Sequence, residues 1–393
     1  MNDLAILQPR LDRLQRNAIL VGTIGLAVCV AAAFGNPQQF FQSYLEAYLF
    51  WIGISLGCLA IVMVHHLVGG AWGLPVRRLL EAGSRTLPLM AALFAPFLVG
   101  TRVLYVWARP QHVAADPLLQ QKALYLNVPG FWIRAIVYFA IWITMTYFLN
   151  KWSLIQDETA EPSLTGRIKA LSGPGLVLYG LTVTFSAIDW VMSLEPEWHS
   201  TMYGMIFMAA QGLEALAFVI IVSYLLARTG PLAKVALTPR FHDLGNLTLT
   251  FVMLWMYTAF SQFLIIWAEN LTDEIPWYLR RSTGGWQDIA IALIVLQFAL
   301  PFVLLLSRVI KRSSQLLSLV AGLILAMQLV SVFWLVAPAF HPGVFRIHWM
   351  DVVAPIGLGG IWLAMFLRQV KNRSLVPRHD PRFVKLLEGL EGK

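Results

Sequence analysis

The chain has 393 residues, of which 58% are hydrophobic and only 13% are charged. Soluble domains carry about 25% charged residues, so this composition excludes an ordinary water-soluble fold. The net charge of +8 comes from basic residues in short segments between apolar runs, which is a topology signal and gives no support to nucleic-acid binding. We therefore predict a single integral membrane domain over residues 1–393 that sits in a lipid bilayer.

Ten apolar runs of membrane-spanning length follow one another along the chain. As a helix, a run of about 20 residues crosses a hydrocarbon core of roughly 30 Å. The runs lie at 18–34, 44–66, 86–107, 131–149, 173–194, 205–226, 247–267, 286–307, 316–340 and 351–367. The polar start 1–17 precedes a run without a clear cleavage site, so we expect a retained first span. The fold class is an all-α polytopic membrane protein with about ten transmembrane helices.

The basic residues alternate between the two sides of this arrangement. Of the 29 Lys and Arg residues, 22 lie in the N-terminal segment, in every second loop and in the tail 368–393. Five lie on the other side, namely Arg109, Lys122, Arg280, Arg281 and Arg346. Loops rich in Lys and Arg stay in the cytoplasm. This split predicts that both termini, segment 1–17 and the basic tail 368–393, are cytoplasmic.

The cysteines and histidines argue against a cofactor held by this chain itself. Cys29 and Cys58 both lie inside apolar runs, and no CxxC or CxxCH motif occurs. Disulfides, thiolate-held iron–sulfur clusters and covalent haem are therefore disfavoured. His65 and His66 are adjacent, so they point about 100° apart on a helix, and the other histidines lie outside the predicted spans. We expect no haem and no metal site.

Three charged residues near the outer ends of spans form the first group of interest. A charge at mid-membrane costs about 2.5–3.5 kcal/mol on insertion scales, so each one needs a partner or a purpose. Glu46, Arg102 and Arg134 lie at similar depth in the second, third and fourth spans. A buried Glu–Arg–Arg cluster that clamps these helices is the prediction, with snorkelling to the interface as the alternative.

A second group of ionisable residues is arranged as a path across the membrane would be. Asp189 closes the fifth span, Glu195 and His199 follow in the turn, and Glu214 lies about ten residues into the sixth span. Burial raises the pKa of a carboxylate towards the range in which it exchanges protons at neutral pH. A buried Glu214 below an outer acidic cluster therefore fits a proton path.

The inner end of that path would be formed by two residues at the start of the seventh span, His242 and Asp243. Each member of this group also has an ordinary structural interpretation. Asp189 suits an interfacial anchor, Glu214 a hydrogen-bonded packing residue, and the pair 242–243 a helix cap with a favourable dipole contact. Asp288 and Asp351, which begin spans eight and ten, are interpreted as caps.

Two long motifs resemble a known family. The stretch FSAIDWVMSLEPEWHSTMYG, residues 185–204, is similar to the fifth-span signature of the quinol-oxidising membrane subunits of bacterial alternative complex III. The stretch 239–286, which contains RFHDLGNLTLTFVMLWMYTAFSQFLIIWAENLTDEIPWYLRR and GGW, resembles the same subunits and points to the second of the two related ones. The resemblance extends over essentially the whole chain.

This resemblance implies a member of the NrfD-like superfamily, with two four-helix bundles and flanking spans, in a bacterial cytoplasmic membrane. It implies a complex that oxidises quinol or menaquinol and passes electrons to a periplasmic carrier or a terminal oxidase. The partners would be a related NrfD-like subunit, an iron–sulfur subunit and c-type haem subunits, which would hold the redox cofactors.

Carried over by position, Asp189, Glu195 and His199 match the family's outer-face motif, and His242 and Asp243 match its inner HD pair. Glu214 is proposed on burial alone. The resemblance leaves open whether this second subunit binds quinol, because the first one is expected to lie against the iron–sulfur partner. The alternatives are a structural scaffold and a secondary transporter, although no inverted repeat or matching pair of broken spans is evident.

Overall fold

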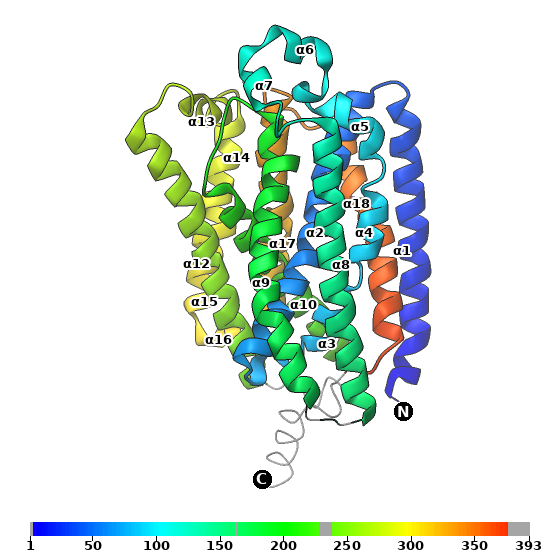
Figure 1. Ribbon diagram of the computed structural model, residues 1–393. Helices are drawn as coiled ribbons and strands as arrows, with labels where there is room; N and C mark the ends of the chain where they lie inside the picture. Colours follow the sequence, from blue (N-terminus) through cyan, green and yellow to red (C-terminus); the bar gives the residue numbers. More distant parts are fainter. Residues whose placement is uncertain (1–2, 160, 162, 228–237, 376–393) are drawn as a thin grey trace.

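The computed structural model describes residues 3–159, 161, 163–227 and 238–375, and throughout these ranges the regular structure is helical, with no strand. Long helices run side by side along one axis (Figure 1). They are α1 (Asp3–Ala33), α2 (Pro37–Val68), α8 (Val128–Thr159), α9 (Ser163–Trp190), α10 (Tyr203–Ala227), α12 (Thr238–Glu269), α17 (Ser314–Val336) and α18 (Trp349–Lys371). A further long rod consists of α14 (Trp286–Ala292), the π-helix η4 (Leu293–Ala299) and α15 (Leu300–Leu306).

Within the described residues, nine helical segments are long and apolar enough to cross a membrane. Each contains an 18-residue window with a mean hydropathy of at least 1.5. The prediction of an all-helical, multi-pass membrane protein is thereby confirmed. The remaining helices are short, namely α3 (Arg77–Ser84), α4 (Leu87–Leu93), α5 (Phe97–Leu104), α6 (Pro110–Ala115), α7 (Pro117–Lys122), α13 (Ile275–Arg281) and α16 (Arg308–Arg312), with 3₁₀ turns η1 (Ala71–Gly73), η2 (Val106–Ala108), η3 (Met192–Leu194) and η5 (Ala337–Ala339).

The third predicted span, residues 86–107, is a broken helix. The stretch Arg77–Leu93 and the stretch Phe97–Leu104 meet at a bend of 71°. Pro96 stands at this bend, as the residue that precedes α5. Proline has no N–H to donate to the preceding turn, so it interrupts a helix where it is inserted. Counted as one span, the bent pair brings the number in the described chain to ten.

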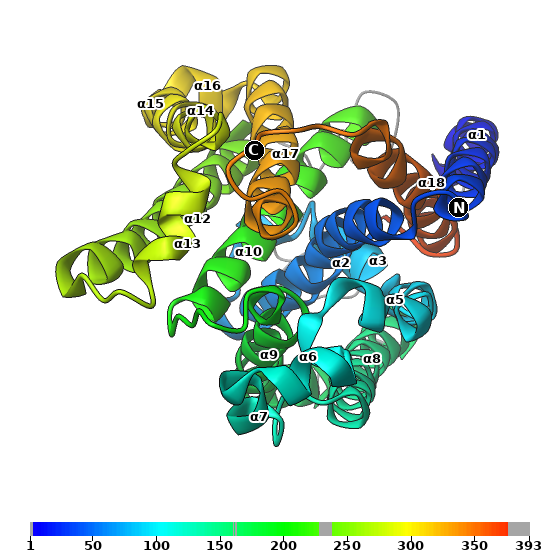
Figure 2. The same ribbon diagram turned by 90° about the horizontal axis from the view of Figure 1, so that it is seen from above.

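Helix α2 forms the centre of the molecule, as the view along the helix axes shows (Figure 2). It packs against α3, α9, α10, α17 and α18. In its most apolar window 89% of the residues are buried, whereas in the corresponding window of α1 only 11% are. Helix α1 is therefore peripheral and packs mainly against α18. Gly22 and Gly360 allow this close approach, because a Cβ at Gly360 would lie 2.6 Å from the Cα of Gly22.

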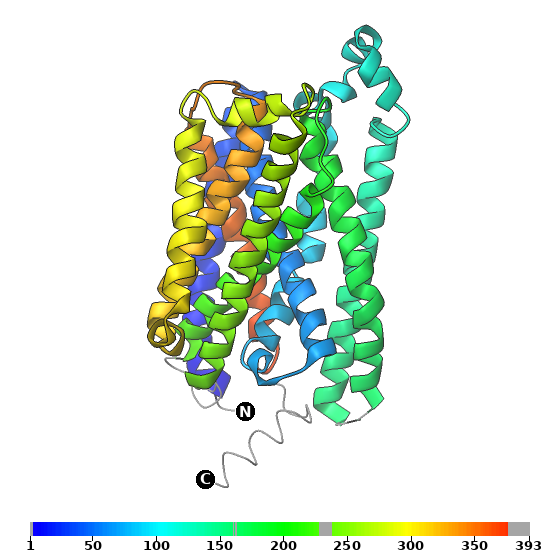
Figure 3. The same cartoon turned by 90° about the vertical axis from the view of Figure 1, so that its left-hand side faces the viewer.

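The short helices gather at opposite ends of the long ones. Helices α6, α7 and α13 lie at one end, called here the α13 end, and α3 and α16 lie at the other, called the α3 end (Figures 1 and 3). The start of α1 and the end of α18 meet at the α3 end, where Lys371 Nζ lies 2.6 Å from Asp12 Oδ1. An even number of spans requires the start of the first helix and the end of the last one to lie at the same end of the molecule. The cytoplasmic side and the grouping into two four-helix bundles stay predictions, and residues 376–393 of the basic tail lie outside the described residues.

The π-helix η4 has a local cause in the sequence. Pro301 follows it and cannot donate an N–H to the carbonyl of Gln297 four residues earlier. A π-helical stretch accommodates one additional residue by pairing each carbonyl with a donor five residues on. The side chain of Gln297 is fully buried there, and both of its amide atoms lack a hydrogen-bond partner among the described residues.

Candidate functional site

Asp189 is completely buried in α9, and its carboxylate is fully occupied. Arg134 of α8 donates from Nε to Oδ2 at 2.9 Å and from Nη2 to Oδ1 at 2.8 Å. The Tyr138 hydroxyl donates to Oδ2 at 2.7 Å, and the guanidinium of Arg134 lies over the ring of Tyr125, 3.9 Å from its centroid. A two-pronged pair of this kind fixes geometry. Asp189 therefore joins α8 to α9 and is not open to a ligand.

The predicted cluster of Glu46, Arg102 and Arg134 does not form. Arg134 pairs with Asp189, and Arg102 is exposed on α5, beyond the bend in the third span. Glu46 is buried and accepts a hydrogen bond from Gln42 Nε2 at 3.4 Å. The helical rise predicts the depth of a residue along the membrane normal, but depth says nothing about the direction in which a side chain points.

Glu46 and Asp351 both line a cavity of about 210 Å³ whose remaining walls are apolar. Asp351 does cap α18, as predicted. It accepts a hydrogen bond from the backbone N–H of His348 at 2.7 Å and, on its other oxygen, from the Ser43 hydroxyl at 2.5 Å. Asp351 thus connects the start of α18 to α2, and Glu46 lies beside it with a single weak donor.

Both carboxylate oxygens of Glu195 are also engaged in ion pairs. Arg280 Nη1 donates to Oε1 at 2.8 Å, and Arg281 Nη2 donates to Oε2 at 2.7 Å. Arg281 is buried, stacks 3.7 Å from the ring centroid of Trp277, and donates to the backbone carbonyl of Leu335 at 2.8 Å. The pair therefore fastens the α13 segment to α17. In the sequence, Arg280 and Arg281 were counted only as evidence of topology. Two adjacent arginines in an outer loop could also have indicated a buried acidic partner.

His199 lies apart from these buried pairs. Its side chain is 67% exposed, and its Nε2 lies 3.7 Å from Glu274 Oε1. His242 and Asp243 lie at the α3 end of α12, where His242 Nδ1 is 3.8 Å from Asp243 Oδ1. From His242 to Trp255 the helix rises about 20 Å. The structure therefore brings together none of the outer-face motif, the inner pair and Glu214.

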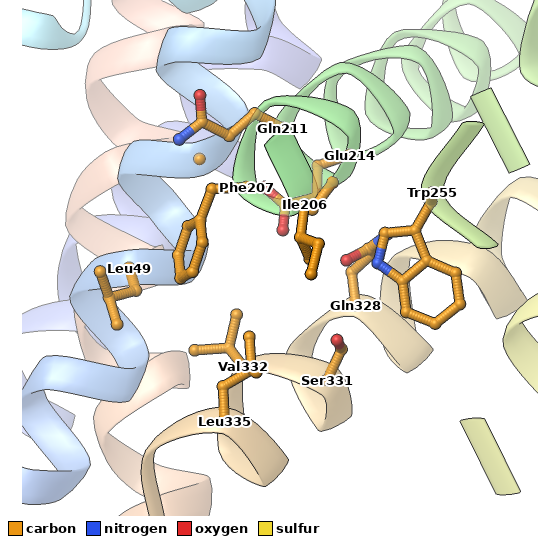
Figure 4. Close-up of a pocket in the computed structure, with 12 residues that line it drawn as sticks. Leu49, Ile206, Phe207, Gln211, Glu214, Trp255, Gln328, Ser331, Val332 and Leu335 are labelled. Carbon is orange, nitrogen blue, oxygen red and sulfur yellow. The ribbon is translucent and has the colours of Figure 1, made fainter. Parts of the chain in front are cut away.

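Glu214 differs from every other predicted carboxylate. It is 2% exposed in the middle of α10, and its Oε2 has no hydrogen-bond partner among the described residues. It lines a cavity of about 20 Å³, together with Gly53, Trp255 and Gln328 (Figure 4). A cavity needs roughly 10–15 Å³ by this measure to hold a water molecule. The space beside Glu214 is therefore large enough for one.

Several polar side chains line this small cavity among apolar ones. Both amide atoms of Gln328 and the Nε1 of Trp255 lack partners within the described residues. Gln211, one turn before Glu214, accepts a hydrogen bond from the Tyr179 hydroxyl at 2.7 Å. Buried polar groups are normally hydrogen-bonded, so their collection at one place makes this a candidate functional site. Gln211, Trp255 and Gln328 are functional candidates that the sequence analysis missed, because neutral residues inside apolar runs give no signal.

A second cavity, of about 410 Å³, lies at the α13 end of this space. It shares four lining residues with the small cavity, namely Ile206, Trp255, Ser331 and Leu335. Its walls come from α10, α12, α13, α14, η4 and α17 and are mostly apolar. Large apolar pockets with a few polar groups are the usual form of small-molecule sites. We call this space the large cavity.

Polar atoms face the large cavity from α12 and α13. Gln262 accepts a hydrogen bond from the Ser200 hydroxyl at 3.0 Å and donates to the Tyr278 hydroxyl oxygen at 3.4 Å. Burial raises the pKa of Tyr278 to about 12, so this hydroxyl stays protonated and remains a donor at neutral pH. Trp334 also lines the cavity, and its Nε1 has no partner within the described part of the chain.

The chemistry this arrangement can perform is narrow. The large cavity could hold an amphiphilic ring with hydroxyl or carbonyl groups, because its walls are apolar and Tyr278 and Gln262 offer hydrogen bonds at its edge. The buried carboxylate of Glu214 lies in the adjoining small cavity. Among the described residues no group of three or more His, Cys, Asp or Glu side chains is placed to hold a metal ion. No protein-family model matches the chain, and no curated protein sequence matches it.

Proposed function

We propose that this chain is an integral membrane subunit of a quinol-oxidising respiratory complex of the alternative complex III type, and that it binds the quinol ring in the large cavity. The observation that supports this most directly is the buried carboxylate of Glu214, whose Oε2 has no hydrogen-bond partner among the described residues. It lines a water-sized cavity that shares four residues with an apolar pocket. The motif resemblance at residues 185–204 and 239–286 supplies the class of complex.

The lining of the large cavity suits a quinol. Its long apolar wall, which includes Phe260, Phe263 and Leu293, would contact the ring and the start of an isoprenoid tail. The hydroxyl of Tyr278 and the amide of Gln262 would pair with the two-oxygen headgroup. Phe260 and Phe263 are 50% and 43% exposed on α12, so the cavity borders the surface that faces lipid, from which a quinol would enter.

Quinol oxidation releases two electrons and two protons, and the two products need separate routes. The electrons would pass to iron–sulfur clusters and c-type haem on partner subunits. The protons need acceptors within this chain, and Glu214 is a buried carboxylate whose Oε2 has no hydrogen-bond partner among the described residues. Glu214 would relay protons in two steps, first passing its own proton towards His242 and Asp243, the inner terminus of the path at the α3 end, and then accepting one from the quinol.

A scaffold role is the second candidate, and specific contacts favour it. Asp189 and Glu195, the two family-motif carboxylates, are fully occupied by Arg134, Arg280 and Arg281. They act as fasteners between helices, as a supporting subunit would require. A transporter is the weaker alternative, although the bent pair of helices at Pro96 is a broken span of the kind found in transporters.

Photo-crosslinking of an azido-quinone to the complex purified from its native membrane, followed by peptide mapping, decides between these roles. The proposal expects label on peptides from α10, α12, α13 and α17 of this chain, and competition by unlabelled quinone. Label confined to a sister subunit would contradict quinol binding here and leave the scaffold role. Purification as a lone chain, without haem-bearing and iron–sulfur-bearing partners, would contradict both.

A further inference from the structure

A further cavity, of about 450 Å³, lies at the α3 end between α8 and α18 and is lined by three basic side chains, Arg85, Lys151 and Arg373. It is far along the helices from the large cavity, and its walls come from the turn before α4, from α8 and from α18 with the residues after it. We call it the basic cavity. Nothing in the proposed quinol chemistry uses it.

The three basic groups are not neutralised by carboxylates. Arg85 donates from Nη2 to the backbone carbonyl of Gln369 at 3.0 Å, and its buried Nε has no partner among the described residues. Arg373 donates from Nη1 to the backbone carbonyl of Asn150 at 3.1 Å. The Lys151 ammonium lies 5.6 Å from the ring centroid of Tyr147. In the described chain, none of the three forms an ion pair.

The nearest acidic groups are already engaged by other arginines. Glu81 Oε1 accepts from Arg77 Nε at 2.9 Å and from the Ser153 hydroxyl at 2.7 Å. Glu81 Oε2 and Asp157 Oδ2 both pair with Arg78. This part of the molecule therefore contains more basic than acidic groups. Burial lowers the pKa of Arg373, which lies outside α18, and an anionic group in the cavity would stabilise its charge.

The rest of the basic cavity is apolar and faces outward. Tyr147 and Leu154 on α8 are 56% and 37% exposed, and Met365 lines the opposite wall from α18. A cationic floor next to an exposed apolar wall, at the end of membrane-spanning helices, matches an amphiphile whose headgroup is negative. Basic pockets between transmembrane helices bind anionic lipid headgroups for this reason.

We propose that the basic cavity is a binding site for one anionic phospholipid, whose phosphate lies between Arg85 and Arg373 and whose acyl chain runs along Tyr147 and Leu154. Lys151 at the mouth contributes a further positive charge. A phospholipid is favoured over free phosphate because an acyl chain would contact the exposed apolar wall, whereas a small anion would leave it uncovered. An anionic lipid is favoured over a zwitterionic one because none of the three basic side chains forms an ion pair with a carboxylate of the described chain.

Native mass spectrometry of the full chain, purified with whatever subunits accompany it, tests the proposal. Dioleoyl-phosphatidylglycerol is titrated against dioleoyl-phosphatidylcholine, so that only the headgroup differs. The expected result is one phosphatidylglycerol bound at concentrations where phosphatidylcholine is not retained. Combined Arg85→Gln and Arg373→Gln substitutions should weaken this binding roughly thirtyfold, because each basic group near a headgroup contributes about a fivefold change.

The matched control changes two exposed basic residues at the same end, Arg368→Gln and Lys169→Gln, which do not line the cavity. It removes the same charge and should leave the affinity unchanged. If the double variant of the two half-buried arginines fails to fold, as judged by lost helical circular dichroism, Lys151→Gln takes its place, because Lys151 is exposed. That single change should still weaken phosphatidylglycerol binding severalfold.

Three outcomes would overturn the proposal. These are equal retention of the two lipids by the unsubstituted chain, equal weakening by the cavity and control variants, and full displacement of the lipid by inorganic phosphate at millimolar concentration. The last result would mean that the acyl chain adds nothing, and that the site recognises phosphate alone.

Discussion

Gly53 of α2 lies directly against the carboxylate of Glu214 of α10, so closely that a Cβ at position 53 would lie 2.1 Å from Glu214 Oε2. One turn later, a Cβ at Gly57 would lie 1.8 Å from the backbone carbonyl oxygen of Gln211. Two glycines one turn apart thus allow α10 to approach α2. They also determine where the unpartnered carboxylate points, which is into the small cavity.

Gly53→Ala should displace Glu214 and reduce quinol oxidation at least tenfold, at a stability cost of about 1–3 kcal/mol for the added methyl group. Quinol:acceptor turnover and the thermal midpoint of the purified complex measure the two effects. Gly322→Ala is the matched control, since a Cβ at Gly322 on α17 meets nothing within 4 Å. Equal turnover in the two variants would show that the position of Glu214 does not matter.

Glu214→Gln keeps the size of the side chain and removes its ability to carry a proton. We expect turnover to fall by about 100-fold, the lower end of the range for a lost general base, while the complex stays assembled. Proton release per quinol, measured in reconstituted vesicles with a pH dye, should fall as well. Glu269→Gln, an exposed glutamate at the end of α12, is the control. Unchanged proton stoichiometry in Glu214→Gln would remove this residue from the path.

Arg134→Gln should be strongly destabilising, because it removes the cationic partner of the fully buried Asp189 carboxylate. Breaking a buried pair in this way costs about 3–5 kcal/mol. The yield of folded protein and its thermal midpoint report the loss, and Asp189→Asn on the same background should restore part of it. The exposed Arg102→Gln should have no effect. Similar losses of stability in Arg134→Gln and Arg102→Gln would contradict the Arg134–Asp189 pair and support the Glu46–Arg102–Arg134 cluster instead.

The two adjacent arginines of α13 should differ sharply. Arg281→Met removes a buried group that joins Glu195, Trp277 and Leu335, so hydrogen exchange in α13 should accelerate and the large cavity should lose its wall. Arg280→Met removes a side chain that is 36% exposed, and the expected change is at most about 1 kcal/mol. Equal protection of α13 in the two variants would refute the assignment of Arg281 as its anchor.

The number and order of the spans were predictable from the sequence because length and hydropathy determine which segments can cross a bilayer. The break in the third span was not predicted, although Pro96 is visible in the sequence, because apolar composition continues across it. The failure of the Glu46–Arg102–Arg134 cluster has the same origin. Helical rise gives the depth of a charge, whereas its direction depends on packing that the bend at Pro96 alters.

Only the charged residues of the candidate site could be predicted from the sequence. Glu214 stands out in the sequence as a carboxylate inside an apolar run, and the structure does place it in a cavity. Gly53, Trp255 and Gln328 define the same space, yet each is unremarkable in a membrane span. Asp189 and Glu195 stood out equally well and turned out to be occupied, because an arginine distant in sequence can reach a carboxylate in ways that spacing does not reveal.

The π-helix η4 sets the angular relation between the two halves of one span. It holds one residue more than an α-helix of the same rise, so the segment before it is rotated by about 100° relative to the segment after it. Leu293 and Ile294, which lie in η4, and Ala290, just before it, all line the large cavity. Deletion of a single residue between 293 and 299 would rewind this stretch as a plain α-helix and turn Ala290 away. The shape of the proposed quinol pocket therefore depends on the number of residues in η4 as well as on the side chains that line it.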